Sequence, residues 1–150
     1  MINKKLRVYL DNCCFNRPYD NQSQLKIELE TKAKLHIQSL IAEDKVDLVI
    51  SYMSEFENND NPFLMKKTAI ADFFKYAKEN ITENLEIIET ANSLKKSGLK
   101  TKDSLHLACA IVSKCDYFMS TDDRLLKHKD KRIKIINPIN FILEEDKENV

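Results

Sequence analysis

Six carboxylates of the chain stand where short apolar runs end or where an apolar segment begins. They are Asp11, Glu55, Glu57, Asp103, Asp122 and Asp123. Carboxylates buried together repel one another, and their pKa values rise unless a cation relieves the repulsion. A site made only of oxygen ligands favours Mg²⁺ or Mn²⁺ over zinc or copper. Such an ion can lower the pKa of a bound water and clamp the oxygens of a phosphodiester. The acids therefore predict a divalent-metal site, provided that the fold brings them together.

Each of these acids also has an ordinary structural interpretation. An aspartate after a strand often forms a turn or caps a helix. Asp103 could favour the positive end of a helix dipole, with Thr101 as the N-cap residue. Taken singly, the structural roles are the more frequent ones. The joint placement of the acids is what favours a metal site.

Alternating strand-like and helix-like segments predict how these acids are positioned. Short runs rich in β-branched and aromatic residues predict strands at Leu6–Leu10, Val46–Ile50, Tyr117–Met119 and Ile133–Ile136. Helical periodicity predicts helices at about 24–42, 70–77, 85–96 (ended by Gly98) and 102–113. The last is apolar nearly all round apart from His106, so we expect it to be central and buried. This alternation predicts crossover connections and a mostly parallel sheet, whose strands carry ligand sites beyond their carboxyl ends.

Length and composition fit one soluble domain over residues 1–150. Hydrophobic residues make up 43% and charged residues 32% of the 150 residues. The lone glycine, Gly98, excludes a P-loop and a G-x-G-x-x-G loop, which both need several glycines. No apolar stretch approaches the roughly 20 residues that span a bilayer. We expect no membrane association, a cytoplasmic location with reduced thiols, and a frayed polar tail over 144–150.

The chain has no global polyanion-binding charge, because 24 basic side chains balance 24 acidic ones. Any nucleic-acid contact must come from a local patch or from metal ions. Basic residues flank the presumed site, and each could contact a phosphate or simply be solvated surface. They are Arg17, Lys100, Lys102, Arg124 and Lys127, the last of which opens the densest basic run, 127–132. His106 lies on the helix face of Asp103, and we interpret it as a packed histidine rather than a metal ligand or general acid.

The same residues resemble the PIN-domain family of nucleases. The resemblance rests on four motifs in order, and it covers about residues 6 to 141. They are Leu10-Asp11-Asn12, Ser51 followed six positions later by Glu57, Asp103-Ser104-Leu105-His106-Leu107-Ala108, and Ser120-Thr121-Asp122-Asp123-Arg124-Leu125-Leu126. The segment 11–18, DNCCFNRP, also resembles the opening of one bacterial and archaeal subgroup.

The resemblance implies a three-layer α/β/α fold with a central, mostly parallel sheet, and cleavage of RNA by water that Mg²⁺ or Mn²⁺ activates. The acids that it assigns to catalysis and to the metal are Asp11, Glu57, Asp103 and Asp123, with Asp122 as an alternative or additional fourth acid. The residues that we expect to contact substrate are Thr121, Asn12, Arg17, Lys102 and Arg124. Glu55 would point elsewhere on its helix. The partners to expect are single-stranded RNA, an antitoxin protein if the chain is a toxin, and a second copy in a homodimer.

Three other functions compete with an endoribonuclease. An aspartyl phosphatase usually carries a second aspartate two residues after the first, where this chain has Cys13. A signal receiver places paired acids after the first strand, whereas the double acid here comes late. A PIN scaffold that binds RNA or a protein partner without cutting is the non-enzymatic alternative, and the intact acids argue against it.

Overall fold

A five-stranded parallel sheet forms the centre of the computed structural model, which describes residues 5–148. The strands are β1 (Arg7–Leu10), β2 (Asp47–Ser51), β3 (Glu79–Ile81), β4 (Tyr117–Met119) and β5 (Lys134–Ile136). They lie in the order β3-β2-β1-β4-β5, and every neighbouring pair is parallel. The predicted α/β class with a central parallel sheet is therefore confirmed.

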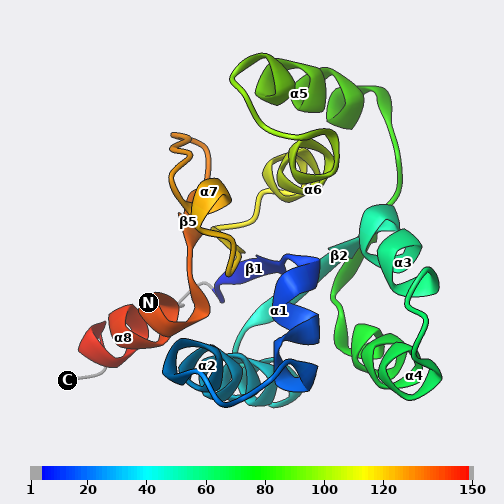
Figure 1. The fold of residues 1–150 in the computed structure, drawn as a ribbon. Coiled ribbons are helices and arrows are strands. Elements are labelled where there is room, and N and C mark those ends of the chain that lie inside the picture. The colour runs from blue at the N-terminus through cyan, green and yellow to red at the C-terminus, as the bar shows by residue number, and fades with distance from the viewer. Residues whose placement is uncertain (1–4, 149–150) are drawn as a thin grey trace.

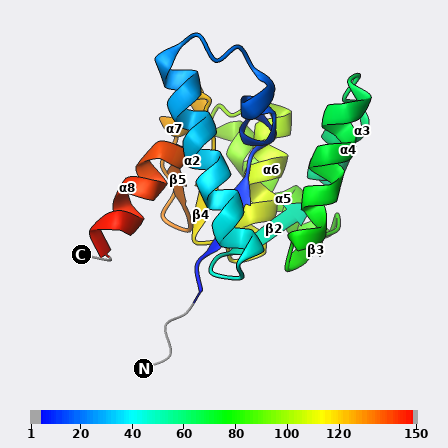
Figure 2. The ribbon, with the colours of Figure 1, turned by 90° about the horizontal axis from the view of Figure 1, so that it is seen from below.

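Helices cover both faces of this sheet, because parallel neighbours need crossover connections. They are α1 (Asn12–Asn16), α2 (Leu25–Ala42), α3 (Tyr52–Asn59), α4 (Leu64–Phe73), α5 (Leu85–Lys96), α6 (Thr101–Val112), α7 (Asp123–Leu126) and α8 (Pro138–Glu148), with short 3-10 helices η1 (Arg17–Tyr19) and η2 (Phe74–Tyr76). Figure 1 shows α5 and α6 above the sheet and α2 and α8 below it. Seen from below, α2 and α8 lie in front of the strands, and α3 and α4 stand together at one side (Figure 2).

Each face of the sheet has its own hydrophobic core, as the alternation of side chains along a strand requires. Val8 and Leu10 of β1 point into the core between the sheet and helices α2 and α8, which includes Ile37 and Phe141. Tyr9, which lies between them in β1, points into the core between the sheet and helices α5 and α6. The helix predicted to be central, α6, is buried from Leu107 to Ile111, which confirms that prediction.

Most predicted elements have the expected bounds, and Gly98 follows α5 with a φ of +108°. The helix expected at about 70–77 differs at both ends. It begins earlier, at Leu64, and Ala77 lies beyond both α4 and η2, because the chain extends there to enter β3. The tail differs too: α8 continues to Glu148, through most of the segment expected to fray, and Glu144 within it contacts Tyr117 and Lys134. Residues 149–150 lie outside the described residues. Within the described chain, no helix combines the length and apolarity needed to cross a membrane.

Because all five strands are parallel, their carboxyl ends lie along the same edge of the sheet. Helices α1, α3, α7 and α8 follow strands closely and start from this edge. Helix α6 precedes β4, so its first turn also faces this edge. The predicted acids follow β1, β2 and β4 or open α6, and all of them therefore belong to the same side of the molecule.

Candidate functional site

Asp11 lies between the ends of β1 and β4 and is only 8% exposed. It is the N-cap of α1, and its Oδ1 accepts a hydrogen bond of 2.8 Å from the Asn12 amide. Its Oδ2 accepts a 3.0 Å bond from the Ser120 hydroxyl, and its amide donates to the Met119 carbonyl. The pKa of Asp11 is raised to about 8, mainly because burial disfavours the charged form and secondly because of the neighbouring Cys13 sulfur.

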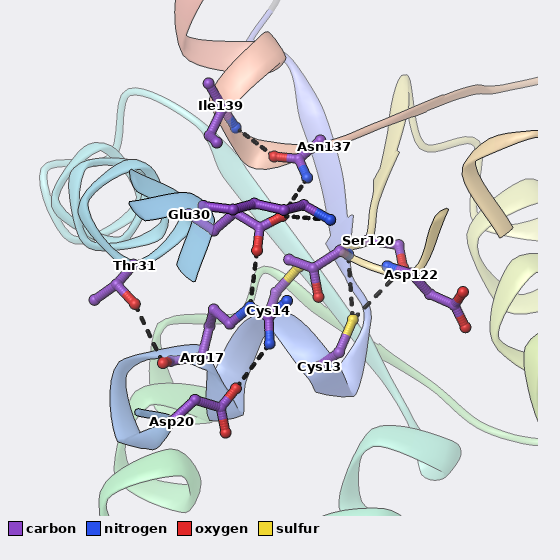
Figure 3. A network of polar contacts seen from close by, with 12 residues as sticks. Cys13, Cys14, Arg17, Asp20, Glu30, Thr31, Ser120, Asp122, Asn137 and Ile139 are labelled. Carbon is purple, nitrogen blue, oxygen red and sulfur yellow. Dashed lines mark hydrogen bonds and ion pairs between the residues drawn. The ribbon is translucent and has the colours of Figure 1, made fainter. Parts of the chain in front are cut away.

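Cys13 is a second ionisable group, in contact with Asp11. Its Sγ lies 3.4 Å from Asp11 Oδ2 and accepts a 3.3 Å bond from the Thr121 amide. The pKa of Cys13 is lowered to about 5, first by its hydrogen bond with the Cys14 thiol and then by Ser120 and Thr121. Figure 3 shows Cys13 on α1 facing the segment from Ser120 to Asp122. Because one of the pair is favoured as neutral when the other is charged, Asp11 and Cys13 together hold one proton near neutral pH.

Asp103 interacts electrostatically with two of the other acids. It lies in the first turn of α6 and is partly buried. Its pKa is raised first by burial, then by the charge of Asp122, and also by that of Glu57. Carboxylates from α3 and from the loop after β4 thus act on the carboxyl group of Asp103, as expected for acids at a shared site.

Glu57 belongs to α3, whose N-terminus is closed by a capping box between Ser51 and Ser54. Its side chain is 14% exposed, and its Oε1 lies 2.7 Å from Nε2 of His106. Glu55 is exposed and bonds Asn80, so it does point elsewhere, as the helical spacing predicts. His106 is buried as predicted, but it is not merely packed: it binds one of the predicted site residues.

The structure separates the two adjacent acids after β4. Asp122 is the N-cap of α7, where its Oδ1 accepts a 2.9 Å bond from the Arg124 amide, and its charge reaches Asp103. The Asp123 side chain is 74% exposed and pairs with Lys26 of α2 at 3.3 Å. The geometry therefore favours Asp122 for the place beside Asp103.

The predicted substrate contacts differ in how far they are already engaged. Arg17 donates to Glu30 and to Asp20, both at 2.9 Å, so its guanidinium is held inside the protein's own ion pairs (Figure 3). Lys102 and Arg124 are exposed, and in the sequence they adjoin Asp103 and Asp123. Thr121 is buried, and its amide donates to Cys13 Sγ. The Asn12 amide donates to Asp11, which is the N-cap residue of α1.

The densest basic run lies away from these acids. Residues 128–134 line a cavity of about 670 Å³ together with Cys115 and Asp116. These last two residues precede β4, so the cavity belongs to the opposite, amino edge of the sheet. The acids and the basic run are therefore separate surface features.

The donor set suits a hard divalent cation in its chemistry, but it is not preassembled. Among residues 5–148, no three Asp, Glu, His or Cys side chains lie close enough together to form a ready-made metal shell. The carboxylates share one edge and raise the pKa of Asp103, which are the conditions that a cation would relieve.

Comparison with known proteins bears on the fold. No protein-family model matches the sequence, and no curated protein matches it. A solved structure, VapBC2 from Rickettsia felis bound to a DNA fragment from their promoter, is similar with a TM-score of 0.58. The similarity covers 88% of this chain and 98% of that chain at 13% sequence identity. The chain has a PIN-like fold. At this identity the likeness extends to the fold and not to activity.

Proposed function

We propose that this protein is a metal-dependent endoribonuclease that hydrolyses RNA phosphodiester bonds with Mg²⁺ or Mn²⁺. The observation that carries the proposal is the buried Asp11, whose pKa is raised to about 8 at the sheet edge that also holds Asp103, Asp122 and Glu57. A carboxyl group so far from its usual pKa is typical of functional sites. The PIN-like fold and the order of the acidic motifs support the same conclusion.

We propose that four carboxylates would hold the ion: Asp11, Glu57, Asp103 and Asp122. The exposed Asp123 would lie at the edge of this site. The ion would supply Lewis acidity, lowering the pKa of a water and clamping phosphodiester oxygens. Lys102 and Arg124 would contact the phosphates on either side of the bond that is cut.

A scaffold that binds RNA or a protein partner without cutting is the second candidate. The observation that favours it is the spread of the carboxylates, which form no ready-made metal shell among the described residues. An antitoxin-type protein and a second copy of the chain are the partners that we propose to test. The similar solved structure is that of VapBC2 with promoter DNA, which supports the antitoxin proposal through the fold alone.

Cleavage of a mixed-sequence single-stranded RNA by purified protein tests the proposed function. We expect cleavage with Mn²⁺ or Mg²⁺, none with chelator, and products with 5′-phosphate and 3′-hydroxyl ends. Attack by the 2′-hydroxyl would leave cyclic phosphates without metal, usually through a general acid and base such as two histidines. Here His36, His106 and His128 lie on separate elements. Chelator-resistant cleavage with cyclic-phosphate ends would refute the mechanism, and Mn²⁺ binding without cleavage of any RNA would favour the scaffold.

The two acids after β4 should differ in their importance. Asp122→Asn should lower cleavage at least ~10-fold more than Asp123→Asn, because only Asp122 shares the field of Asp103. Asparagine caps a helix about as well as aspartate, so α7 should remain intact in both variants. The rates of the two matched variants under saturating Mn²⁺ make the comparison. A larger loss in Asp123→Asn would return the fourth-acid role to that residue.

Mn²⁺ affinity should depend on pH through the proton shared by Asp11 and Cys13. Below about pH 8, the pKa of Asp11, the native protein retains that proton, and the ion must displace it. Affinity should therefore rise with pH, by up to about tenfold per unit, and level off above pH 8. Calorimetry in buffers of different ionisation enthalpy should show about one proton released. Asp11→Asn should bind Mn²⁺ weakly with no such slope; an unchanged slope would assign the proton elsewhere.

A further inference from the structure

A buried chain of hydrogen bonds leads from Glu57 back to the N-terminus of its own helix. Glu57 Oε1 lies 2.7 Å from His106 Nε2, and His106 Nδ1 lies 2.5 Å from the Tyr9 hydroxyl. That hydroxyl lies 2.7 Å from Oγ of Ser51, the N-cap of α3. His106 and Tyr9 are 1% and 0% exposed, so the chain passes through the core under α6.

The helix cap determines in which direction the protons of this chain point. Ser51 Oγ accepts the amides of Met53 and Ser54 at 3.1 and 3.3 Å, which occupies both of its lone pairs. Its own hydroxyl proton is therefore left for the Tyr9 oxygen, 2.7 Å away. The Tyr9 hydroxyl lies 2.5 Å from His106 Nδ1 and 3.2 Å from Ser54 Oγ, and the shorter contact is the one along which Tyr9 donates.

With Nδ1 acting as an acceptor, the ring proton of His106 resides on Nε2 and is donated to Glu57. We propose that His106 is a positioning residue for Glu57, held in the Nε2–H tautomer by Tyr9 and the N-cap of α3. The inference rests on the proposed function, in which Glu57 is a metal ligand. Hydrogen-bond partners that orient ligating groups in this way affect metal affinity about 10–100-fold.

This chain of hydrogen bonds joins the same strands and helices that position the acids. Tyr9 stands two residues before Asp11 on β1, and His106 stands three residues after Asp103 on α6. Ser51 is the N-cap residue of α3, and Glu57 lies near the end of the same helix. The Tyr9 ring stacks on Phe118 with centroids 5.4 Å apart and meets the His106 ring edge-on at 5.6 Å, which fixes both rings. The hydrogen-bond chain thus fixes the relative positions of the elements that carry Asp11, Asp103 and Glu57, three of the four proposed ligands.

Four variants separate orientation from packing. Tyr9→Phe keeps the ring and removes the donor to Nδ1. His106→Gln places an amide N–H near the position of Nε2, whereas His106→Asn places one near Nδ1 and leaves Glu57 without its donor. Tyr117→Phe is the matched control, since it removes another tyrosine hydroxyl from the same sheet, one that bonds Glu144 on the far face.

The test combines ¹⁵N NMR of the histidine rings with Mn²⁺ calorimetry. We expect the Nε2–H tautomer for His106 in the wild type and a mixture of tautomers in Tyr9→Phe. Mn²⁺ affinity should fall about 10-fold in Tyr9→Phe and His106→Asn, stay within about threefold in His106→Gln, and be unchanged in Tyr117→Phe. An Nδ1–H tautomer in the wild type overturns the inference, as does wild-type affinity in both Tyr9→Phe and His106→Asn.

The same measurements distinguish failure of the inference from failure of the proposed function. If the wild type binds no Mn²⁺, the proposed function fails, and the ring tautomer alone then decides whether His106 donates to Glu57. If His106→Asn does not fold, Tyr9→Phe decides the question, because it removes one oxygen from a ring that stays stacked on Phe118.

Discussion

Asp11→Asn should lower metal-dependent RNA cleavage at least ~100-fold, because an amide cannot replace the charge of a metal ligand. The fold should survive the change. Asparagine can still accept the Asn12 amide, and it removes a buried carboxyl group whose charged form is disfavoured. The rate at saturating Mn²⁺ measures the loss, and the melting curve without metal checks the fold.

The matched control is Asp72→Asn, which removes an exposed carboxylate of α4 that pairs with Lys75 at the surface. Its cleavage rate should equal that of the wild type. Mn²⁺ should raise the melting temperature of the wild type and of this control, since an ion that binds only the folded state stabilises it. The same shift in Asp11→Asn, with cleavage unchanged, would remove Asp11 from the proposed site.

Arg17→Met should destabilise the fold by about 3 kcal/mol, because it leaves Glu30 charged inside the protein without its main partner. Glu30 is fully buried, and it accepts bonds from Arg17 at 2.9 Å and from Asn137 at 2.5 Å. Figure 3 shows this network joining η1, α2 and the segment after β5. Urea denaturation measures the free energy of unfolding.

Lys75→Met is the control for this second experiment, because it breaks an exposed ion pair and should cost no more than ~0.5 kcal/mol. Adding Glu30→Gln to Arg17→Met should recover part of the lost stability, since the uncompensated charge disappears. Equal effects of Arg17→Met and Lys75→Met would show that Glu30 does not depend on Arg17. Full stability with lost cleavage would instead favour the phosphate-contact role that the sequence predicts for Arg17.

Much of the fold could be predicted because its strands and helices have strong local patterns. Strands β1, β2, β4 and β5 are apolar runs, and α6 is apolar nearly all round. Strand β3 could not be predicted, since Glu79–Ile81 holds one apolar residue and forms only as an edge strand against β2. The polar residues at the end of α8 predict a frayed tail, because the contacts of Glu144 with β4 and β5 that hold this end are tertiary.

The edge that carries the acids could be predicted from chain order alone, but the partners of the acids could not. The difference between Asp122 and Asp123 depends on which residue caps α7 and which reaches Lys26. The bond from His106 to Glu57 depends on Tyr9, which is 97 residues away from His106. Its local sequence marks Tyr9 as one more apolar strand residue. Contacts of this kind arise from packing and leave no periodic signal in the sequence.

The strand order has a consequence for the newly made chain. Strand β1 lies at the centre of the sheet, but one of its two neighbours, β4, is synthesised more than 100 residues later. The bond from Ser120 that fixes Asp11 spans 109 residues of chain. A nascent chain that has emerged only as far as α6 can pair β1 with β2, but it still lacks Met119 and Ser120, which bond Asp11. The acidic edge is therefore completed late, by contacts of long sequence separation that form slowly. A protein that cleaves RNA would in this way acquire its activity only after most of its chain has left the ribosome.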